Sequence, residues 1–303
     1  MRHLLSLKDF STQEIEQILS IALDLKIKLR QGIREPLFPG CVLGMIFQKQ
    51  SLRTRVSFEA AMAHLGGAAI FLADDAGFGK REPICDFSHV LSEMVDLIMI
   101  RAKRHEDVVE FASYASVPVI NGLTDYCHPC QALADILTWR ELVGNTTGRK
   151  LAWVGDANNV ALSLAFICGK LGIRMSIAVP KEYNFSDEAL QQIHDNAPGF
   201  KLEVTQDPVE AVSGAGVVYT DVWVSMGQEN EKAKREHDFA PYQVNSELMS
   251  HCPEAYFMHC LPARRGFEVT DEVISSPQSA IVQEAGNRLH AQKGAVVWLL
   301  RQK

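Results

Sequence analysis

The sequence predicts an α/β protein with two domains, each built on a mostly parallel sheet flanked by helices. Short buried-strand patterns alternate with helical patterns, and this alternation runs through two successive series of similar length. Between the series lies a turn-rich segment, residues 144–148 (GNTTG), which is the best linker candidate in the chain. We therefore expect one domain over residues 1–144 and a second over residues 145–283.

The first series opens with a capping box from Ser11 to Glu14, followed by apolar residues at helical spacing. A helix is predicted to begin near Val56, and a longer one to cover about residues 130–143. Apolar runs predict four buried strands, at residues 42–47, 68–72, 97–100 and 117–120.

The second series repeats the pattern and ends in a helix from about residue 284 to residue 300. Its strands are predicted at residues 151–154, 175–178, 202–204, 217–220, 256–259 and 280–282. In parallel sheets, ligands bind beyond the carboxyl ends of the strands. Polar residues that directly follow these strands are therefore the candidate site residues.

Composition excludes several classes of protein. The 303 residues are 47% hydrophobic and 22% charged, and no stretch approaches the apolar length of a membrane span. The N-terminus lacks the apolar segment of a signal peptide. Seven irregularly spaced cysteines argue against a disulfide framework and favour a cytoplasmic setting. A net charge of −7 argues against nonspecific nucleic-acid binding.

Two strand ends of the first series carry anion-binding chemistry. Ser51, Arg53 and Thr54 follow the strand at residues 42–47 and precede a helix, so hydroxyls, guanidiniums and helix N-terminal N–H groups gather there. Arg101 ends the run at residues 97–100. A solvated basic helix start and a surface arginine are the alternative interpretations. The glycines of a Walker loop are missing.

A third strand end carries the segment TDYCHPCQ, in which Cys127 and Cys130 form a Cys-x-x-Cys around His128. It is compatible with a redox dithiol at a helix start. It is equally compatible with a helix start that points His128 and Gln131 into a cleft. A zinc site would need a second ligand pair at short spacing, which the cysteines and histidines near residues 251–260 do not provide.

The second series offers three further motifs at strand ends. VGDANN places Asn158 and Asn159 after a strand, without the glycines of a dinucleotide fingerprint. DVWVSMG offers Asp221 and Ser225, and MHCLPARR offers Cys260 and the bond from Leu261 to Pro262.

Taken in order, SLRTR, HPCQ, DVWVSMG and HCLP resemble the motifs of the aspartate/ornithine carbamoyltransferase family, with DVWVSMG typical of its ornithine-type members. The resemblance covers essentially the whole chain. It implies that the first domain binds carbamoyl phosphate, that the second binds ornithine and that the last helix packs back on the first. Cys127 and Cys130 are then incidental to the H-P-x-Q motif.

The resemblance also implies residue roles. Ser51, Arg53, Thr54 and the Leu52 amide would hold the phosphate, Arg101 would bridge phosphate and carbonyl oxygen, His128 would donate to that carbonyl, and Gln131 would hold the carbamoyl NH2. Cys260, Leu261 and Arg288 would lie near the carbamoyl group. Asn159, Asp221, Ser225 and Met226 would hold ornithine. The catalytic set would be Arg101, His128, Cys260 and Asp221.

The implied reaction joins the δ-amine of L-ornithine to the carbamoyl group, giving L-citrulline and phosphate, as in arginine biosynthesis. Positioning and charge stabilisation suffice for it, so neither metal nor cofactor is expected. Carbamoyl phosphate would bind first. The resemblance further implies a homotrimer, or a multiple of trimers, in which the loop at residues 79–82 reaches a neighbouring subunit.

Four positions depart from the family pattern: Leu52, Gly77, His89 and Gly286. Gly286 is expected to weaken the final helix by about 1 kcal/mol. The sequence leaves open whether the role is anabolic or catabolic. Two alternatives also stay open: transfer to another amine, such as putrescine or N-acetylornithine, and a non-catalytic paralogue that binds a small ligand.

Overall fold

The computed structural model describes residues 1–225 and 228–302, and the chain divides into two compact units. Unit 1 comprises residues 1–137 and 286–303, and unit 2 comprises residues 138–285. Both boundaries fall inside long helices, α5 (Pro129–Val143) and α12 (Ile281–Leu300). Unit 1 is therefore assembled from two segments that are far apart in the sequence.

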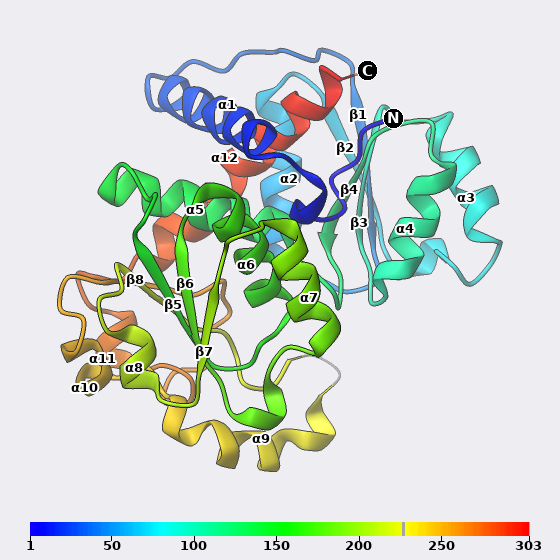
Figure 1. Ribbon diagram of the computed structural model, residues 1–303. Coiled ribbons are helices and arrows are strands. Elements are labelled where there is room, and N and C mark those ends of the chain that lie inside the picture. The colour runs from blue at the N-terminus through cyan, green and yellow to red at the C-terminus, as the bar shows by residue number, and fades with distance from the viewer. Residues whose placement is uncertain (226–227, 303) are drawn as a thin grey trace. The chain divides into compact units, whose positions relative to one another are not determined.

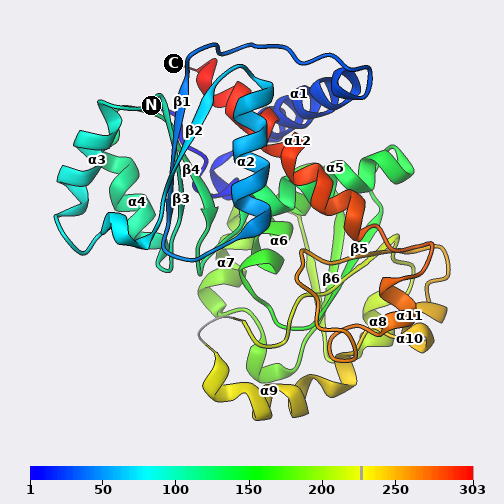
Figure 2. The same cartoon turned by 180° about the vertical axis from the view of Figure 1, so that it is seen from behind.

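Unit 1 contains a four-stranded, all-parallel sheet in the order β2-β1-β3-β4. Helices α3 and α4 cover one face of the sheet, and α2 lies on the other (Figures 1 and 2). The two central strands of this sheet, β1 and β3, are buried on both faces and are therefore nearly continuous apolar runs, whereas the edge strand β2 is exposed or half-buried. The strands are β1 (Val42–Phe47), β2 (Ala68–Leu72), β3 (Leu97–Arg101) and β4 (Val119–Leu123).

Serine side chains cap the N-termini of two helices in unit 1, α1 and α2. Ser11 caps α1 and forms the predicted capping box with Glu14, since each residue's side chain accepts a hydrogen bond from the other's main-chain N–H. The α-helices of this part of the chain are α1 (Thr12–Arg30), α2 (Leu52–His64), α3 (Ile84–Ser92) and α4 (His105–Tyr114). It also contains two short 3-10 helices, η1 (Leu7–Asp9) and η2 (Asp74–Ala76).

The core between the sheet and helices α3 and α4 is built around three phenylalanines. Phe78, Phe87 and Phe111 pack edge-to-face, with ring centroids 5.8–6.4 Å apart. Such aromatic contacts add to the free energy gained from burying their surfaces. This core holds β3 in place, and β3 ends at the candidate residue Arg101.

Unit 2 contains a five-stranded, all-parallel sheet in the order β7-β6-β5-β8-β9. The order reverses beside β5, and the crevice at such a reversal is where ligands bind in open α/β sheets. Helices α6 and α7 cover one face, and α8, α10 and α11 cover the other (Figure 1). The strands are β5 (Lys150–Val154), β6 (Arg174–Ala178), β7 (Leu202–Thr205), β8 (Val217–Tyr219) and β9 (Tyr256–Met258).

The helices of unit 2 lie between these strands. They are α6 (Asn159–Leu171), η3 (Lys181–Tyr183), α7 (Asp187–Asn196), α8 (Pro208–Val212), η4 (Glu229–Glu231), α9 (Lys232–Phe239), η5 (Ala240–Tyr242), α10 (Ser246–Ser250) and α11 (Asp271–Ile274).

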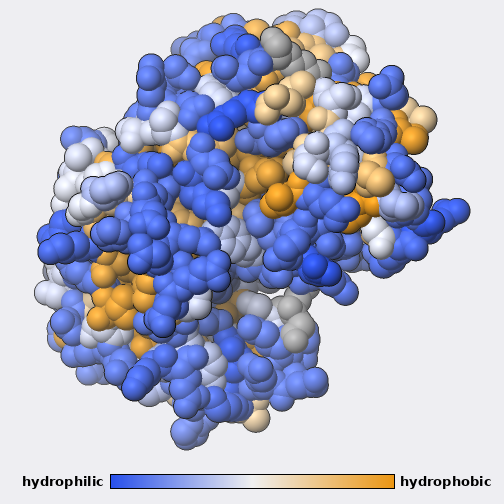
Figure 3. Space-filling model, turned by 45° about the vertical axis from the view of Figure 1, so that its right-hand side comes forward, coloured by the Kyte–Doolittle hydropathy of each residue, from blue (hydrophilic) through white to orange (hydrophobic). Residues whose placement is uncertain are grey.

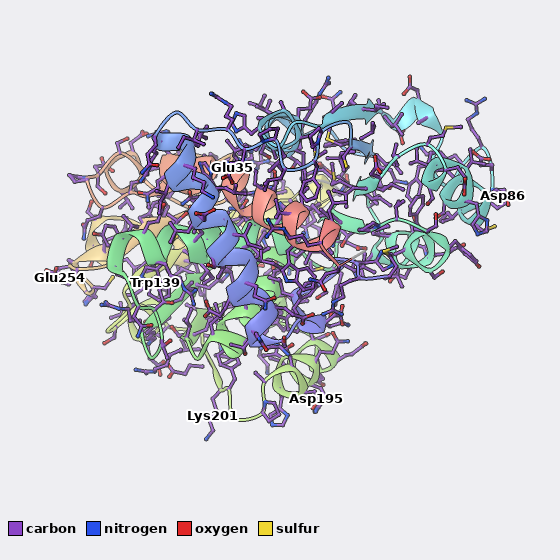
Figure 4. All side chains as sticks on the ribbon, turned by 90° about the horizontal axis from the view of Figure 1, so that it is seen from above. Glu35, Asp86, Trp139, Asp195, Lys201 and Glu254 are labelled. Atoms are coloured by element: carbon purple, nitrogen blue, oxygen red, sulfur yellow. The ribbon has the colours of Figure 1, made fainter. Side chains whose placement is uncertain are left out.

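Trp139, labelled in Figure 4, shows why a glycine precedes β8. Its side chain is fully buried, and a Cβ atom built on Gly216 would lie 3.2 Å from the indole Cζ2 atom. A larger residue at this position would require the buried ring to shift by a few tenths of an ångström, so glycine suits this close approach.

The two-domain α/β prediction is confirmed, with corrections at individual elements. The strand predicted at residues 280–282 is wrong, because Ile281 already opens α12 and Val282 is 80% exposed. The strand predicted at residues 117–120 is β4, which begins two residues later and ends three residues later. The domain boundary predicted at residue 144 stays a prediction.

The face shown in Figure 3 is mostly hydrophilic, with apolar residues in separate patches. Within residues 1–225 and 228–302, no helix combines the length and the apolarity that crossing a membrane requires.

Candidate active site

The N-terminus of α2 forms the first part of the site in unit 1. Ser51 caps the helix: its Oγ accepts the main-chain N–H of Thr54 at 3.2 Å and donates to the Thr54 hydroxyl at 3.0 Å. The predicted start near Val56 is wrong, since the helix begins at Leu52. The earlier start places Leu52, Arg53 and Thr54 in the first turn, where the main-chain N–H groups of Leu52 and Arg53 have no helical acceptor and can bind an anion.

The parallel register of β1 and β3 brings Arg101 to this turn. Phe47 is paired with Arg101, so both strands end at the same edge of the sheet. Arg101 is 7% exposed, and its guanidinium donates to the Thr54 hydroxyl at 3.3 Å. The alternative interpretation as a surface arginine is therefore wrong.

Arg288 from α12 reaches the same hydroxyl. One of its terminal nitrogens lies 3.4 Å from Thr54 Oγ1, and the other donates to Gln131 Oε1 at 2.8 Å. Gln131 in turn donates from Nε2 to Asp135 at 2.8 Å, which fixes the orientation of its amide. Two guanidiniums thus converge on one hydroxyl at a helix N-terminus, which is the charge arrangement that a phosphate requires.

His128 lies near enough to Arg288, Arg101 and Arg53 for their positive charges to affect its protonation. Burial lowers the pKa of its imidazole well below its usual value, and the charges of Arg288, Arg101 and Arg53 lower it further. The ring is therefore neutral at physiological pH, so one nitrogen carries a proton and can donate a hydrogen bond to an uncharged carbonyl oxygen.

The two cysteines that flank His128 are engaged elsewhere. Cys127 donates to the Leu5 carbonyl oxygen at 3.2 Å, and Cys130 donates to the Asn121 carbonyl oxygen at 3.6 Å. Burial raises the pKa of Cys127 to about 12 and that of Cys130 to about 11. Thiols of this kind stay protonated, whereas redox and metal-binding cysteines need the thiolate. The interpretation as a helix start that directs His128 and Gln131 fits the geometry best.

The positions that depart from the family pattern have local physical explanations. Gly77 ends η2 in the left-handed region, with φ of 80°, which a side chain would strain. His89 packs edge-to-face on Tyr114, with centroids 5.7 Å apart. Leu52 is 75% exposed in the first turn of α2 and keeps its main-chain N–H.

In unit 2, the ends of β5 and β8 meet through an asparagine and an aspartate. Asn158 caps α6, with its Oδ1 accepting the N–H groups of Val160 and Ala161. Its Nδ2 donates to Asp221 Oδ2 at 2.8 Å. The predicted ligand residue Asn159 occupies the first position of α6 and is half-buried.

The HCLP segment follows β9 in a constrained conformation. Leu261 has φ of 58°, and its bond to Pro262 is cis. The Leu261 N–H donates to His259 Nδ1 at 2.9 Å, and His259 Nε2 lies 3.1 Å from Glu268 Oε1. The main-chain N–H of Arg264 also donates to Glu268. A buried His–Glu pair therefore fixes the path of the chain through Cys260 and Leu261.

Asp221 and Cys260 are brought together in unit 2. The ligand atoms of Asp221, His259 and Cys260 lie within 4.8 Å of one another. Both ring nitrogens of His259 are already in hydrogen bonds, so this trio is poorly suited to a metal ion. Ser225 lies in the same loop as Asp221, and its N–H donates to Gln228 Oε1 at 2.9 Å. Met226 lies outside the described residues.

Three residues organise the site: Asn158, which sequence reasoning placed only at a strand end, and Glu268 and Glu284, which it did not single out. Asn158 holds Asp221, and Glu268 holds His259. Glu284 accepts hydrogen bonds from the Tyr219 hydroxyl and from the His259 N–H, both at 2.9 Å. Asn158 could have been identified as a helix cap from its position, but its partner is distant in the sequence. The other two are buried carboxylates with no motif of their own.

Comparison with known proteins agrees with this geometry. Residues 2–141 match the carbamoyl-P binding domain of aspartate/ornithine carbamoyltransferase, and residues 147–299 match its Asp/Orn binding domain. The chain is 52% identical over 303 residues to an ornithine carbamoyltransferase of Carboxydothermus hydrogenoformans, covering 99% of this chain and 97% of the relative. It is 50% identical over 303 residues to the anabolic enzyme of Pyrococcus furiosus, covering 99% and 96%.

Solved structures give the same result. The ornithine carbamoyltransferase of Pyrococcus furiosus superimposes with a TM-score of 0.96 at 49% identity, covering 100% of this chain and 98% of that one. The anabolic enzyme of Campylobacter jejuni superimposes with a TM-score of 0.93 at 37% identity, covering 100% of both chains. With family matches in both units, the chain belongs to the aspartate/ornithine carbamoyltransferase family.

Proposed function

We propose that this protein transfers the carbamoyl group of carbamoyl phosphate to the δ-amine of L-ornithine, giving L-citrulline and phosphate. The observation that carries the proposal is the convergence of Arg101 and Arg288 on the Thr54 hydroxyl at the N-terminus of α2. The names of the similar proteins support ornithine as the acceptor, and the anabolic relatives support a role in arginine biosynthesis.

In this proposal, residues 1–144 and the last helix, residues 284–303, form the carbamoyl-phosphate-binding domain. Ser51, Arg53, Thr54 and the Leu52 N–H hold the phosphate. Arg101 bridges a phosphate oxygen and the carbamoyl oxygen, to which neutral His128 donates. Gln131 and Arg288 lie against the carbamoyl group.

The chemistry follows from this charge distribution. The neutral δ-amine attacks the carbamoyl carbon, and the new N–C bond moves electrons onto the carbonyl oxygen. Arg101 and His128 are positioned to stabilise that oxyanion, which is where preorganised donors lower a barrier most. The C–O bond to the phosphate then breaks, phosphate leaves with the electron pair, and the extra proton of the attacking nitrogen ends on the departing phosphate, which balances the reaction.

Ornithine binds to residues 145–283 in this proposal. Asp221 pairs with the α-ammonium group, while Asn159, Ser225 and Met226 contact the carboxylate and the chain. Cys260 and Leu261 approach the reacting groups from the HCLP segment. An acetylated amine would leave Asp221 without its cation, and putrescine would leave the carboxylate donors without an acceptor.

The test is a carbamoylation assay with L-ornithine, putrescine, N-acetylornithine and aspartate, in which carbamoylated product and phosphate are both measured. We expect equimolar citrulline and phosphate, and a kcat/KM for ornithine at least about a hundredfold above the others if each mismatch costs roughly 3 kcal/mol. Asp221→Asn should impair ornithine use while sparing carbamoyl phosphate binding. Equal use of putrescine or N-acetylornithine would contradict the acceptor assignment, and no turnover with any amine would favour a binding paralogue.

We also propose that the protein is cytoplasmic and assembles as a homotrimer or a multiple of trimers. The segment at residues 79–82 is exposed, and Lys80 is held by an ion pair to Asp74 at 2.7 Å. This segment would reach the neighbouring subunit. Sedimentation analysis of the wild type and of Lys80→Ala would test the assembly.

A further inference from the structure

Arg235 is a buried cation that none of the motifs includes. It lies in α9, is 4% exposed, and its guanidinium stacks 4.7 Å from the ring centroid of Tyr183. Its Nε donates to the Trp223 carbonyl oxygen at 2.6 Å, and one terminal nitrogen forms an ion pair with Asp156. A buried charge is retained only where its partners repay the cost of removing it from water.

These contacts join two loops of the proposed ornithine site. Asp156 belongs to the loop after β5, and its main-chain oxygen accepts the N–H of Asn158 at 2.8 Å. Trp223 belongs to the loop after β8, two residues beyond Asp221. Arginine suits this task because its planar fork makes several hydrogen bonds in fixed directions, which a lysine ammonium cannot do.

The two carboxylates of these loops, Asp156 and Asp221, differ in whether a cation balances their charge. Burial raises the pKa of Asp156 to about 6, the Arg235 charge opposes that rise, and Asp221 and Glu231 add to it. Asp221 therefore lies close enough to Asp156 for the two carboxylates to repel each other. Asp221 receives hydrogen bonds from Asn158 and from the Val222 N–H, but no described cationic side chain forms an ion pair with it.

We infer that Arg235 is a positioning residue for the amino-acid substrate: it neutralises Asp156 and tethers Trp223, so that of these two carboxylates only Asp221 is left without a cationic partner for the substrate's ammonium group. This inference rests on the proposed function and extends it to a residue that does not touch the substrate. Arg235 sets both the net charge of the site and the separation of its two loops.

A charge-balance series tests the inference, with KM for ornithine as the principal readout. Arg235→Met should raise this KM by up to roughly a hundredfold, as expected when positioned groups shift by about 1 Å. Arg235→Lys, which keeps the charge but loses the fork, should recover part of the loss. Asp156→Asn should also raise KM, because Arg235 would then oppose the substrate's ammonium group.

The double variant Asp156→Asn/Arg235→Met separates charge assignment from simple structural damage. It restores the net charge, so its KM should lie below that of Arg235→Met. Damage to packing alone would make the double variant at least as impaired as the single one. Lys232→Met is the matched control, because this exposed lysine on the same helix pairs only weakly with Glu236, at 3.7 Å. It should stay within about twofold of the wild type.

Carbamoyl phosphate binding, measured by calorimetry without ornithine, completes the design. Most of its proposed contacts lie in unit 1, so every variant should keep a Kd close to that of the wild type. The inference is overturned if Arg235→Met leaves KM for ornithine within twofold of the wild type, if the double variant fails to improve on it, or if carbamoyl phosphate binding weakens in parallel. Failure of the wild type to carbamoylate ornithine would instead overturn the proposed function.

Discussion

The main-chain N–H of Leu261 donates to Nδ1 of His259 at 2.9 Å. Since Nδ1 is the acceptor, the ring proton must be on Nε2, which faces Glu268 Oε1 at 3.1 Å. The tautomer of His259 is therefore set by the turn that follows it. This turn also depends on the carboxylate of Glu268, which is fully buried.

Removing this carboxylate should destabilise unit 2. Glu268→Ala would leave the His259 Nε2–H and the Arg264 N–H without their acceptor, at about 1–3 kcal/mol for each buried group. Glu268→Gln keeps an acceptor oxygen and should lose less. Urea unfolding measures the difference, with the exposed Glu272→Ala as control. A Glu268→Ala variant as stable as the control would show that the His–Glu pair does not hold the turn.

Arg101→Ala should lower kcat far more than it weakens ornithine binding to the complex with carbamoyl phosphate. Loss of one preorganised donor to an oxyanion costs roughly 3–4 kcal/mol, on the order of a hundred- to a thousandfold in rate. Steady-state kinetics at saturating carbamoyl phosphate provides the measurement. Arg104→Ala is the matched control, because its side chain is 67% exposed. Near-normal kcat in Arg101→Ala would place this residue outside the catalytic site.

The double variant Cys127→Ser/Cys130→Ser should keep turnover within a few-fold of the wild type. The raised pKa values, about 12 and about 11, leave almost no thiolate at pH 8. Neither cysteine should react with iodoacetamide in the folded protein, whereas half-buried Cys85 should react faster. Peptide mass spectrometry distinguishes these sites. Rapid labelling of Cys127 or Cys130, or stoichiometric zinc in the purified protein, would restore the redox or metal interpretation.

Two glycines of α12 should respond in opposite ways to alanine. A Cβ at Gly286 would meet no atom within 4 Å, so Gly286→Ala should stabilise the helix by about 0.5–1 kcal/mol. A Cβ at Gly294 would collide with the Ile18 carbonyl oxygen and lie 2.9 Å from the Ala22 Cβ, so Gly294→Ala should destabilise the fold. Denaturant midpoints of the two variants test this contrast. Equal shifts would mean that packing against α1 does not determine the tolerance of α12.

Lys293 should make stability depend on pH in the alkaline range. Burial, with the nearby Arg34 charge, lowers the pKa of Lys293 to about 8, so between pH 8 and 10.5 the folded state binds fewer protons than the unfolded chain. The free energy of unfolding should therefore rise with pH across this window. Lys293→Met should gain up to about 3 kcal/mol at pH 7, at roughly 1.4 kcal/mol per pKa unit.

The gain in Lys293→Met should shrink as the pH approaches 10. Lys201→Met is the control, because this lysine is exposed at the edge of unit 2 (Figure 4). A pH profile of Lys293→Met that runs parallel to the wild-type profile would contradict the assignment.

The strands could be predicted well because parallel strands buried on both faces are continuous apolar runs. The bounds of β1 and β2 were predicted to the residue, but the expectation that β2 is buried was wrong, because it is an edge strand whose residues are exposed or half-buried. The strand predicted at residues 280–282 was wrong because a three-residue apolar run is equally compatible with the start of a helix, and Ile281 opens α12. The start of α2 was placed too late because Leu52 and Arg53 show no apolar periodicity, although Ser51 was available as a cap.

Many contacts of the candidate site join residues that are far apart in the sequence, so local sequence patterns could not predict them. Arg288 donates to Gln131 across 157 positions of the sequence, and only the family resemblance connected them. Asp156 stands in the VGDANN motif, but Arg235 belongs to none of the motifs, and nothing in the sequence connected the two residues. Long-range charge pairs of this kind depend on how loops meet in space, which periodicity and spacing do not specify.

The two-segment construction of unit 1 has a consequence for synthesis of the chain on the ribosome. Residues 1–137 contain the whole four-stranded sheet, yet the guanidinium of Arg288 that reaches Thr54 is translated only near the end. A nascent chain can form its sheet early and still lack a complete anion pocket until α12 has emerged. Any truncated product that stops before residue 288 therefore lacks one of the two cations that converge on Thr54, however well its first 137 residues fold.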